Sequence, residues 1–152
     1  MKNNKGFSLV ELIIVIAIMA ILVGVMAPQL IKYIEKSKVS ADTQAADAVH
    51  SAILTAMMDP EVVNDPNYNG SSVLTAAGAS ISTGLATTDP IGSAALEILG
   101  ETSGADVISR LKSTGATDIQ FWADNNKVSI VVTGSDSRGS KDTSGTYAIA
   151  VY

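Results

Sequence analysis

Cysteine is absent from the 152-residue chain, and histidine occurs only once, at His50. The missing thiols exclude disulfide bridges, thiolate metal ligands and a cysteine nucleophile, and one histidine cannot form a multi-histidine metal site. The sequence also lacks a G-x-S-x-G pattern, and no combination of residues suggests an acid–base pair in a pocket. We therefore expect neither an enzyme nor a bound cofactor.

Aromatic and basic residues are scarce as well. Aromatic side chains make up 5% of the sequence, so a core must be built mainly from alanine, valine, isoleucine and leucine. The 10 Lys and Arg residues are outnumbered by 15 Asp and Glu residues, which gives a formal net charge of -5. A nucleic-acid binder needs a basic surface, so we expect no nucleic-acid partner for the isolated chain. The length suits one ordinary domain and is too short for two.

Charge is absent altogether between Leu12 and Ile31, a stretch of 20 residues. As a helix this stretch is about 30 Å long, which matches the hydrocarbon thickness of a bilayer, and it is apolar all round. A chain of this size can hardly bury such a helix, so a membrane span is favoured. A secretory signal peptide is the alternative, but the stretch is long for one, and Pro28 directly follows its best small-residue exit at Ala27.

A single carboxylate interrupts the apolar pattern near its start. Glu11 follows Phe7, Ser8, Leu9 and Val10, so it lies just inside the apolar segment. A carboxylate in a bilayer is costly, which makes it a candidate functional residue that needs a partner. The alternative is that Glu11 lies at the membrane interface and extends toward water. The residue alone leaves both interpretations open.

The residues around Glu11 form a recognisable motif. The run Lys5-Gly6-Phe7-Ser8-Leu9-Val10-Glu11-Leu12 resembles the leader and cleavage motif of type IV prepilins. The resemblance implies a basic leader, residues 1–6, that a prepilin peptidase removes by cutting between Gly6 and Phe7. It also implies methylation of the new amine of Phe7. Glu11 is then the fifth mature residue, as in the family. The motif covers about the first 35 residues and does not identify the rest.

The resemblance implies a partner for Glu11, namely the free N-terminal amine of Phe7 in a neighbouring subunit. Opposite charges attract far more strongly in a low-dielectric filament core than in water. A buried charge without a partner is penalised, so this pair sets the register between subunits more than it adds stability. The resemblance further implies a helical homo-oligomeric filament, an assembly platform and an ATPase. The precursor would lie in the cytoplasmic membrane and the assembled filament on the cell surface.

Helical periodicity continues beyond the apolar stretch. Apolar residues recur at helical spacing on one face of residues 32–58, and polar residues fill much of the remainder. The apolar positions are Val39, Ala46, Val49, Ile53 and Ala56, and the polar positions assigned to the exposed side are Lys36, Lys38, Asp42, Gln44 and Asp47. Asp59-Pro60 is a natural stop. We therefore predict one helix from Phe7 to Met58, of which only the second half covers a soluble domain.

Gly24 and Pro28 weaken the middle of the apolar part of this helix. Pro28 removes an amide donor and clashes with the preceding turn. The result is either a simple kink or a helix break that melts in the filament and lets it stretch. The sequence leaves both open.

The rest of the chain predicts an α+β fold, with the long N-terminal helix packed on a small antiparallel sheet. Turn signals dominate from Asp59 to about Pro90. Short helices are expected near Ser93–Leu99 and Ala105–Lys112, and strands at Thr117–Ala123, Lys127–Thr133 and Thr146–Tyr152. The expected divisions are a leader (1–6), a membrane or filament-core helix (7–31), an amphipathic half-helix (32–58) and a globular α/β head with a three-stranded C-terminal sheet (59–152).

Ligand sites are weakly indicated. Asp136 and Asp142 lie among hydroxyl and carbonyl groups of the kind that calcium prefers, but they match no calcium-binding relative residue by residue, and no metal is expected. The loop that holds them nearly spells a phosphate-binding motif, but Lys141 comes one residue late and no helix follows. His50 is expected to be a packing residue.

The leading functional interpretation is a structural subunit of a type IV pilus. A filament of this kind serves adhesion, motility, biofilm formation or transport. One alternative is a pseudopilin of a type II secretion or DNA-uptake system. A second alternative is an uncleaved membrane-anchored binding domain, which leaves Glu11 without a reason.

Overall fold

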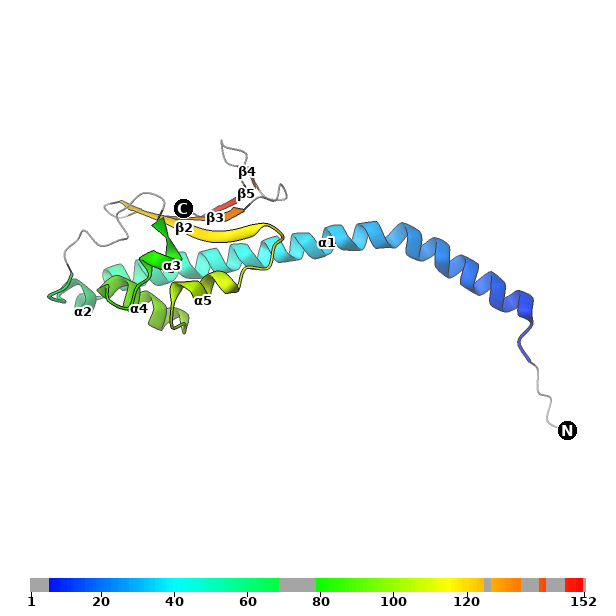
Figure 1. Ribbon diagram of the computed structural model, residues 1–152, viewed down its shortest axis with the longest axis horizontal. Helices are drawn as coiled ribbons and strands as arrows, with labels where there is room; N and C mark the ends of the chain where they lie inside the picture. The colour runs from blue at the N-terminus through cyan, green and yellow to red at the C-terminus, as the bar shows by residue number, and fades with distance from the viewer. Residues whose placement is uncertain (1–5, 69–78, 125–126, 135–139, 142–146, 152) are drawn as a thin grey trace. The chain divides into compact units, whose positions relative to one another are not determined.

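The chain divides into two units, residues 1–35 and residues 36–152, in a computed structural model (Figure 1). The structure describes residues 6–68, 79–124, 127–134, 140–141 and 147–151, and it describes side chains within 6–68, 79–121 and 128–133. The helices are α1 (Leu9–Met58), α2 (Pro60–Val63), α3 (Ile81–Gly84), α4 (Pro90–Leu99) and α5 (Gly104–Ser109). The strands are β1 (Ala79–Ser80), β2 (Ala116–Asp124), β3 (Lys127–Gly134), β4 (Ser140–Lys141) and β5 (Tyr147–Val151).

The first unit contains the apolar part of α1. Its best 18-residue window has a mean hydropathy of 3.0, and no residue of that window is buried. By length and composition this helix can cross a membrane. The helix is continuous through Gly24 and Pro28, so the isolated chain keeps α1 whole where the sequence marked a weak point. Melting of this segment in a filament stays a prediction.

The end of α1 follows its sequence signal. Met58 is the last helical residue, and Asp59 adopts an extended conformation (φ -74°, ψ 121°) before Pro60. The Asp59 side chain accepts a hydrogen bond from the backbone N of Glu61 at 2.9 Å, so the same residue that ends α1 caps α2. The predicted boundary at Met58 is confirmed.

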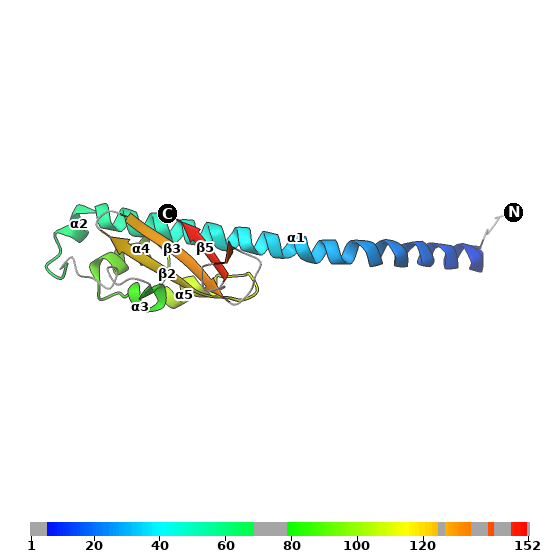
Figure 2. The same ribbon diagram turned by 90° about the horizontal axis from the view of Figure 1, so that it is seen from above.

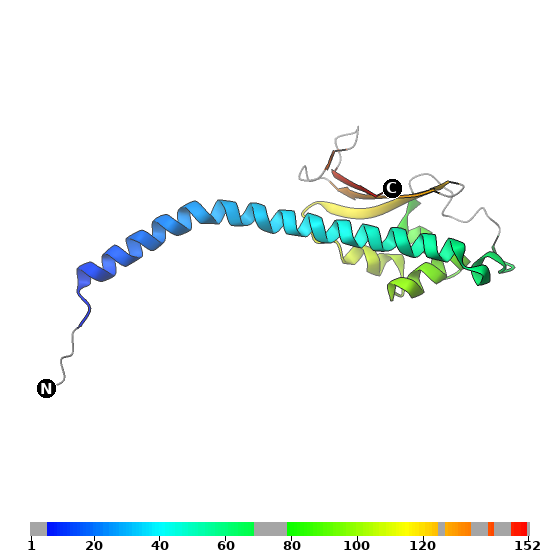
Figure 3. The ribbon, with the colours of Figure 1, turned by 180° about the vertical axis from the view of Figure 1, so that it is seen from behind.

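In the second unit the sheet lies over the C-terminal part of α1, and the short helices α3, α4 and α5 lie along the same part of α1 (Figures 1 and 3). The strand order is β1-β2-β3-β5-β4, and every described pair is antiparallel. The strands β2, β3 and β5 are the three that the alternating pattern predicted, and Figure 2 shows them side by side. The α+β prediction is confirmed, with two-residue strands added at both edges of the sheet.

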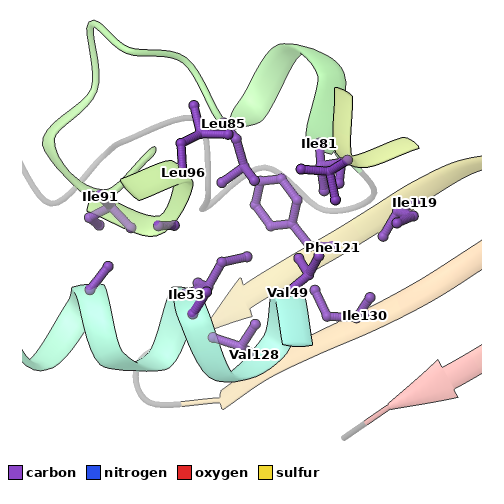
Figure 4. Packing of buried hydrophobic residues seen from close by; sticks show 14 of the residues in the cluster. Val49, Ile53, Ile81, Leu85, Ile91, Leu96, Ile119, Phe121, Val128 and Ile130 are labelled. Carbon is purple, nitrogen blue, oxygen red and sulfur yellow. The ribbon is translucent and has the colours of Figure 1, made fainter. Parts of the chain in front are cut away.

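The core of the second unit lies between α1, the inner face of the sheet and the helices α3 and α4 (Figure 4). Alternate residues of β2 and β3 point into it, and the register pairs Phe121 with Ile130 and Ile119 with Val132. The predicted apolar face of α1 is confirmed. Its buried members are Ala46, Val49, Ile53 and Ala56, joined by Ala52, and Val39 is partly buried against them.

The expectation for one residue of the polar face of α1 is wrong. The helical pattern predicts that Asp42 is exposed, but it has 0% of its surface exposed. Lys36, Gln44 and Asp47 are exposed as expected, and Lys38 is half-buried. The periodicity fails at Asp42 because its burial depends on donors from a distant part of the chain.

Two glycines fix the connections around the short helices. Gly100 ends α4 with φ +69°, the left-handed conformation that glycine adopts without strain. A Cβ atom at Gly104 would lie 1.9 Å from the backbone oxygen of Ile81, so the first turn of α5 can approach α3 only with glycine there.

Candidate functional site

The start of α1 is built as a helix cap around Ser8 and Glu11. The backbone N of Ser8 donates a hydrogen bond to Glu11 Oε2 at 2.8 Å, and the backbone N of Leu12 donates to the Ser8 carbonyl oxygen at 3.2 Å. A glutamate three residues after a serine that reaches back to the serine amide forms one half of a capping box. Glu11 therefore has a partner within its own chain.

This position suits the charge of Glu11. Unpaired amides give a helix N-terminus a partial positive charge, which favours a carboxylate in the first turn. A carboxylate has two oxygens and about four lone-pair sites, so one hydrogen bond from Ser8 leaves capacity for a cation. The sequence predicts a charged partner or an interfacial position for Glu11 and does not include this local role, although the S-x-x-E signal at Ser8–Glu11 marks it.

The residues before the helix are accessible. Phe7 has 86% of its surface exposed, and residues 6–8 are in no helix or strand. A Cβ atom on Gly6 would meet nothing within 4 Å, so among the described residues nothing obstructs a side chain at position 6.

The other predicted site residues are not gathered at this segment. Gly24 and Pro28 lie further along α1, and a Cβ atom on Gly24 would also meet open space. Asp136 and Asp142, the weak calcium candidates, lie outside the described residues. Within the described part of the chain, no group of three or more His, Asp or Glu side chains is placed to hold a metal ion.

His50 joins α1 to the sheet. Its Nε2 atom lies 2.8 Å from the carbonyl oxygen of Val128, and the side chain is half-buried. As the partner is a carbonyl oxygen, Nε2 carries the proton in this contact. The arrangement is that of a packing residue with one satisfied polar atom.

Asp42 is the polar residue of α1 that is buried although exposure was predicted for it. Its carboxylate accepts hydrogen bonds from the backbone N of Lys112 at 2.7 Å, from the backbone N of Ser113 at 2.9 Å and from the Ser113 hydroxyl. A buried carboxylate is tolerated only when such donors replace water. Asp42 thereby fastens the connection between α5 and β2 to α1.

A hollow of about 310 Å³ lies in the second unit, and none of the predicted site residues that the structure describes lines it. Carboxylates are prominent in its lining, which comprises Asp59, Glu61, Val62, Asp65, Asn67, Thr87, Thr88, Pro90, Ser93, Ala94 and Glu97. This lining contains no lysine, arginine or histidine. The accessible N-terminal segment, which carries the motif, is the candidate functional site.

Comparison with known proteins agrees with this choice of segment. A family model described as the prokaryotic N-terminal methylation motif matches residues 1–27, which include Gly6, Phe7 and Glu11. No solved structure matches the chain significantly.

Similar curated proteins include type IV major fimbrial proteins FimA of Dichelobacter nodosus. One is 36% identical over 89 residues, which is 57% of this chain and 57% of the relative. Another is 34% identical over 97 residues, which is 62% of this chain and 61% of the relative. The matches thus span about six tenths of the length of these curated relatives. The start of the chain thus matches the prokaryotic N-terminal methylation motif, and about six tenths of the chain is similar to type IV major fimbrial proteins.

Proposed function

We propose that the chain is a structural, non-catalytic subunit of a type IV pilus, cut between Gly6 and Phe7 and polymerised through α1. The observation that carries this proposal is the apolar part of α1, whose most hydrophobic 18-residue window has no buried residue, with the methylation motif at its start. The names of the relatives, major fimbrial proteins, favour a pilus over a pseudopilus.

The apolar part of α1 needs a cover that the isolated chain does not supply. Most of its large apolar side chains, among them Leu9, Ile21 and Val23, expose more than half of their surface. A surface of this extent is unfavourable in water and marks a membrane or protein contact. Lipid covers it in the precursor, and the same helices of other subunits replace lipid in the filament. A contact of this head-to-tail kind does not close on itself, so it produces an open helical filament.

Cleavage after Gly6 adds the charge that directs assembly. The new amine of Phe7 is a cation next to Ser8, whose amide is bound to Glu11. Glu11 retains acceptor capacity for the Phe7 amine of a neighbouring subunit. In a filament core of low dielectric this pair sets the register between subunits. The partners are a prepilin peptidase, an assembly platform with its ATPase and further copies of the chain. The locations are the cytoplasmic membrane before assembly and the cell surface afterwards.

The decisive experiment is mass spectrometry of the N-terminus, with membrane and sheared surface fractions measured separately. A chain that starts at N-methyl-Phe7 in the sheared fraction supports a pilus. The same processed chain confined to the membrane and periplasm indicates a pseudopilin. An intact Met1 leader in both fractions overturns the proposal.

A substitution tests the cleavage site directly. Gly6→Val places a branched side chain beside the bond to be cut and should leave the precursor uncut in the membrane. Gly24→Ala is the matched control, because position 24 also has open space around it but lies far from the cut. Processed filaments from Gly6→Val would refute the assigned site.

A further inference from the structure

We infer that Lys32 and Tyr33 anchor the precursor at the outer surface of the membrane and thereby set the depth of the Gly6–Phe7 bond at the inner surface. This inference rests on the proposed membrane-inserted precursor, with the leader on the cytoplasmic side as the resemblance to type IV prepilins implies. The partner of the two side chains is the lipid headgroup layer.

The first observation is that the two ends of the uncharged run Leu12–Ile31 differ in chemistry. At its inner end Glu11 is held by the amide of Ser8 at 2.8 Å. At its outer end the first charge is Lys32, and Tyr33 follows directly. Between Glu11 and Lys32 lie 20 uncharged residues, about 30 Å of helix, which matches the hydrocarbon layer.

The second observation is the exposure of Tyr33, which has 69% of its surface free. Tyrosine is enriched at membrane interfaces because its ring favours the apolar side and its hydroxyl favours water. Lysine beside it extends its ammonium group to the headgroups while its stem covers apolar surface. By contrast, Tyr68, the next aromatic residue along the chain, is half-buried against the core of the second unit. Tyr33 is not among the described residues that pack against this core.

The helix length connects the anchor to the cut. From Leu9 to Tyr33 the helix rises through 24 residues, or about 36 Å, slightly more than the hydrocarbon thickness. With Tyr33 at the outer headgroups, Leu9 therefore lies at the inner headgroups. Gly6 and Phe7, which precede the helix, lie on the cytoplasmic side of them. A peptidase acting at the inner membrane surface then meets the bond in a non-helical and accessible segment.

The absence of cysteine makes the depth measurable. Single cysteines placed at each position from 6 to 14 give one thiol per chain. The full-length precursor is reconstituted without peptidase in vesicles of phosphatidylethanolamine and phosphatidylglycerol. A membrane-impermeant maleimide is then added on the leader side. The labelling rate should fall steeply close to Glu11, where the chain enters the hydrocarbon.

Removing the anchor should move this boundary in a defined direction. With Lys32→Ala and Tyr33→Ala together, the uncharged run extends from Ile31 to Ile34, because Glu35 is the next charge. The helix should slide toward the cytoplasm, and the labelling boundary should move by about three residues, or roughly 4.5 Å, toward Ile14. Tyr33→Trp should keep the original boundary, because tryptophan is also an interfacial residue. Lys112→Ala, at an exposed lysine of the second unit, is the matched charge control.

The outcomes separate the anchor from the proposed function. An unchanged boundary in the double variant overturns the anchor, while the membrane-inserted precursor stands. An unchanged boundary with loss of filaments also overturns it, because Lys32 and Tyr33 would then contact another subunit. Labelling at all positions without a boundary overturns membrane insertion and with it the proposed function. A shifted boundary together with slower cleavage by added peptidase supports the anchor and its role in placing the bond.

Discussion

Replacing Asp42 should destabilise the second unit far more than any other change to the polar residues of α1. Asp42→Ala leaves the backbone N of Lys112, the backbone N of Ser113 and the Ser113 hydroxyl without their acceptor in a buried place. Each unsatisfied buried donor costs about 1–3 kcal/mol, and some relaxation toward water is expected, so the loss should be roughly 3 kcal/mol. For a unit of this size the corresponding fall in melting temperature is about 10 °C.

The assay is thermal unfolding of the full-length chain in mild detergent, followed by near-ultraviolet circular dichroism. Asp47→Ala is the matched control, because it removes the same side chain from an exposed position of the same helix. The control should stay within about 0.5 kcal/mol of the wild type. Asp42→Asn keeps one acceptor oxygen and should fall between the two. An Asp42→Ala variant as stable as Asp47→Ala would show that the contacts of Asp42 contribute nothing to stability.

Three further predictions concern other parts of the chain. Glu11→Gln keeps an acceptor for Ser8 but loses the charge, so it should be cleaved normally and give a lower yield of sheared filaments; a wild-type yield would remove the proposed charge pair. Hydrogen bonds from Thr102 and Ser103 hold the pKa of Asp106 below its ordinary value of 3.8, so Thr102→Val should raise that pKa in a carboxyl NMR titration. Since the pKa of Asp106 is lower in the folded than in the unfolded chain, the stabilisation from Asp106 is present above pH 3.8 and is lost as the pH falls through the folded value. A titration of Thr102→Val identical to that of the wild type would contradict this assignment. Gly104→Ala forces a methyl group onto the Ile81 carbonyl and should lower the free energy of unfolding by several kcal/mol. Gly24→Ala, in open space, should instead stabilise its helix by about 0.5–1 kcal/mol. Equal urea midpoints for the two variants would contradict the packing.

The parts of the fold that the sequence predicted are those with local causes. Helix α1 ends where Asp59-Pro60 forbids continuation, and β2, β3 and β5 follow period-two alternation. The helices α4 and α5 begin after Asp89 and Ser103, whose side chains cap them. The candidate site was found for the same reason, because Gly6, Phe7 and Glu11 form one short motif.

The missed parts depend on contacts between distant residues. The two-residue strand β1 exists because Ala79 and Ser80 pair with Phe121 and Gln120. No periodicity can be read from two residues, nor from the four residues of α2 or of α3. The burial of Asp42 depends on donors 70 and 71 residues away.

The capping arrangement at the start of α1 has a consequence for processing. The described hydrogen bonds of the cap join Ser8 to Glu11 and Leu12, so they lie after the proposed cut between Gly6 and Phe7. The proposed removal of the leader breaks none of these hydrogen bonds. The change that it makes is electrostatic, because Lys2 and Lys5 depart, the side chains then sum to 8 positive and 15 negative charges, or -7, and a cation appears at Phe7. We therefore expect precursor and product to keep the same helix cap and to differ in the charge at its tip, so that an inert inserted form becomes an assembling one without refolding of α1.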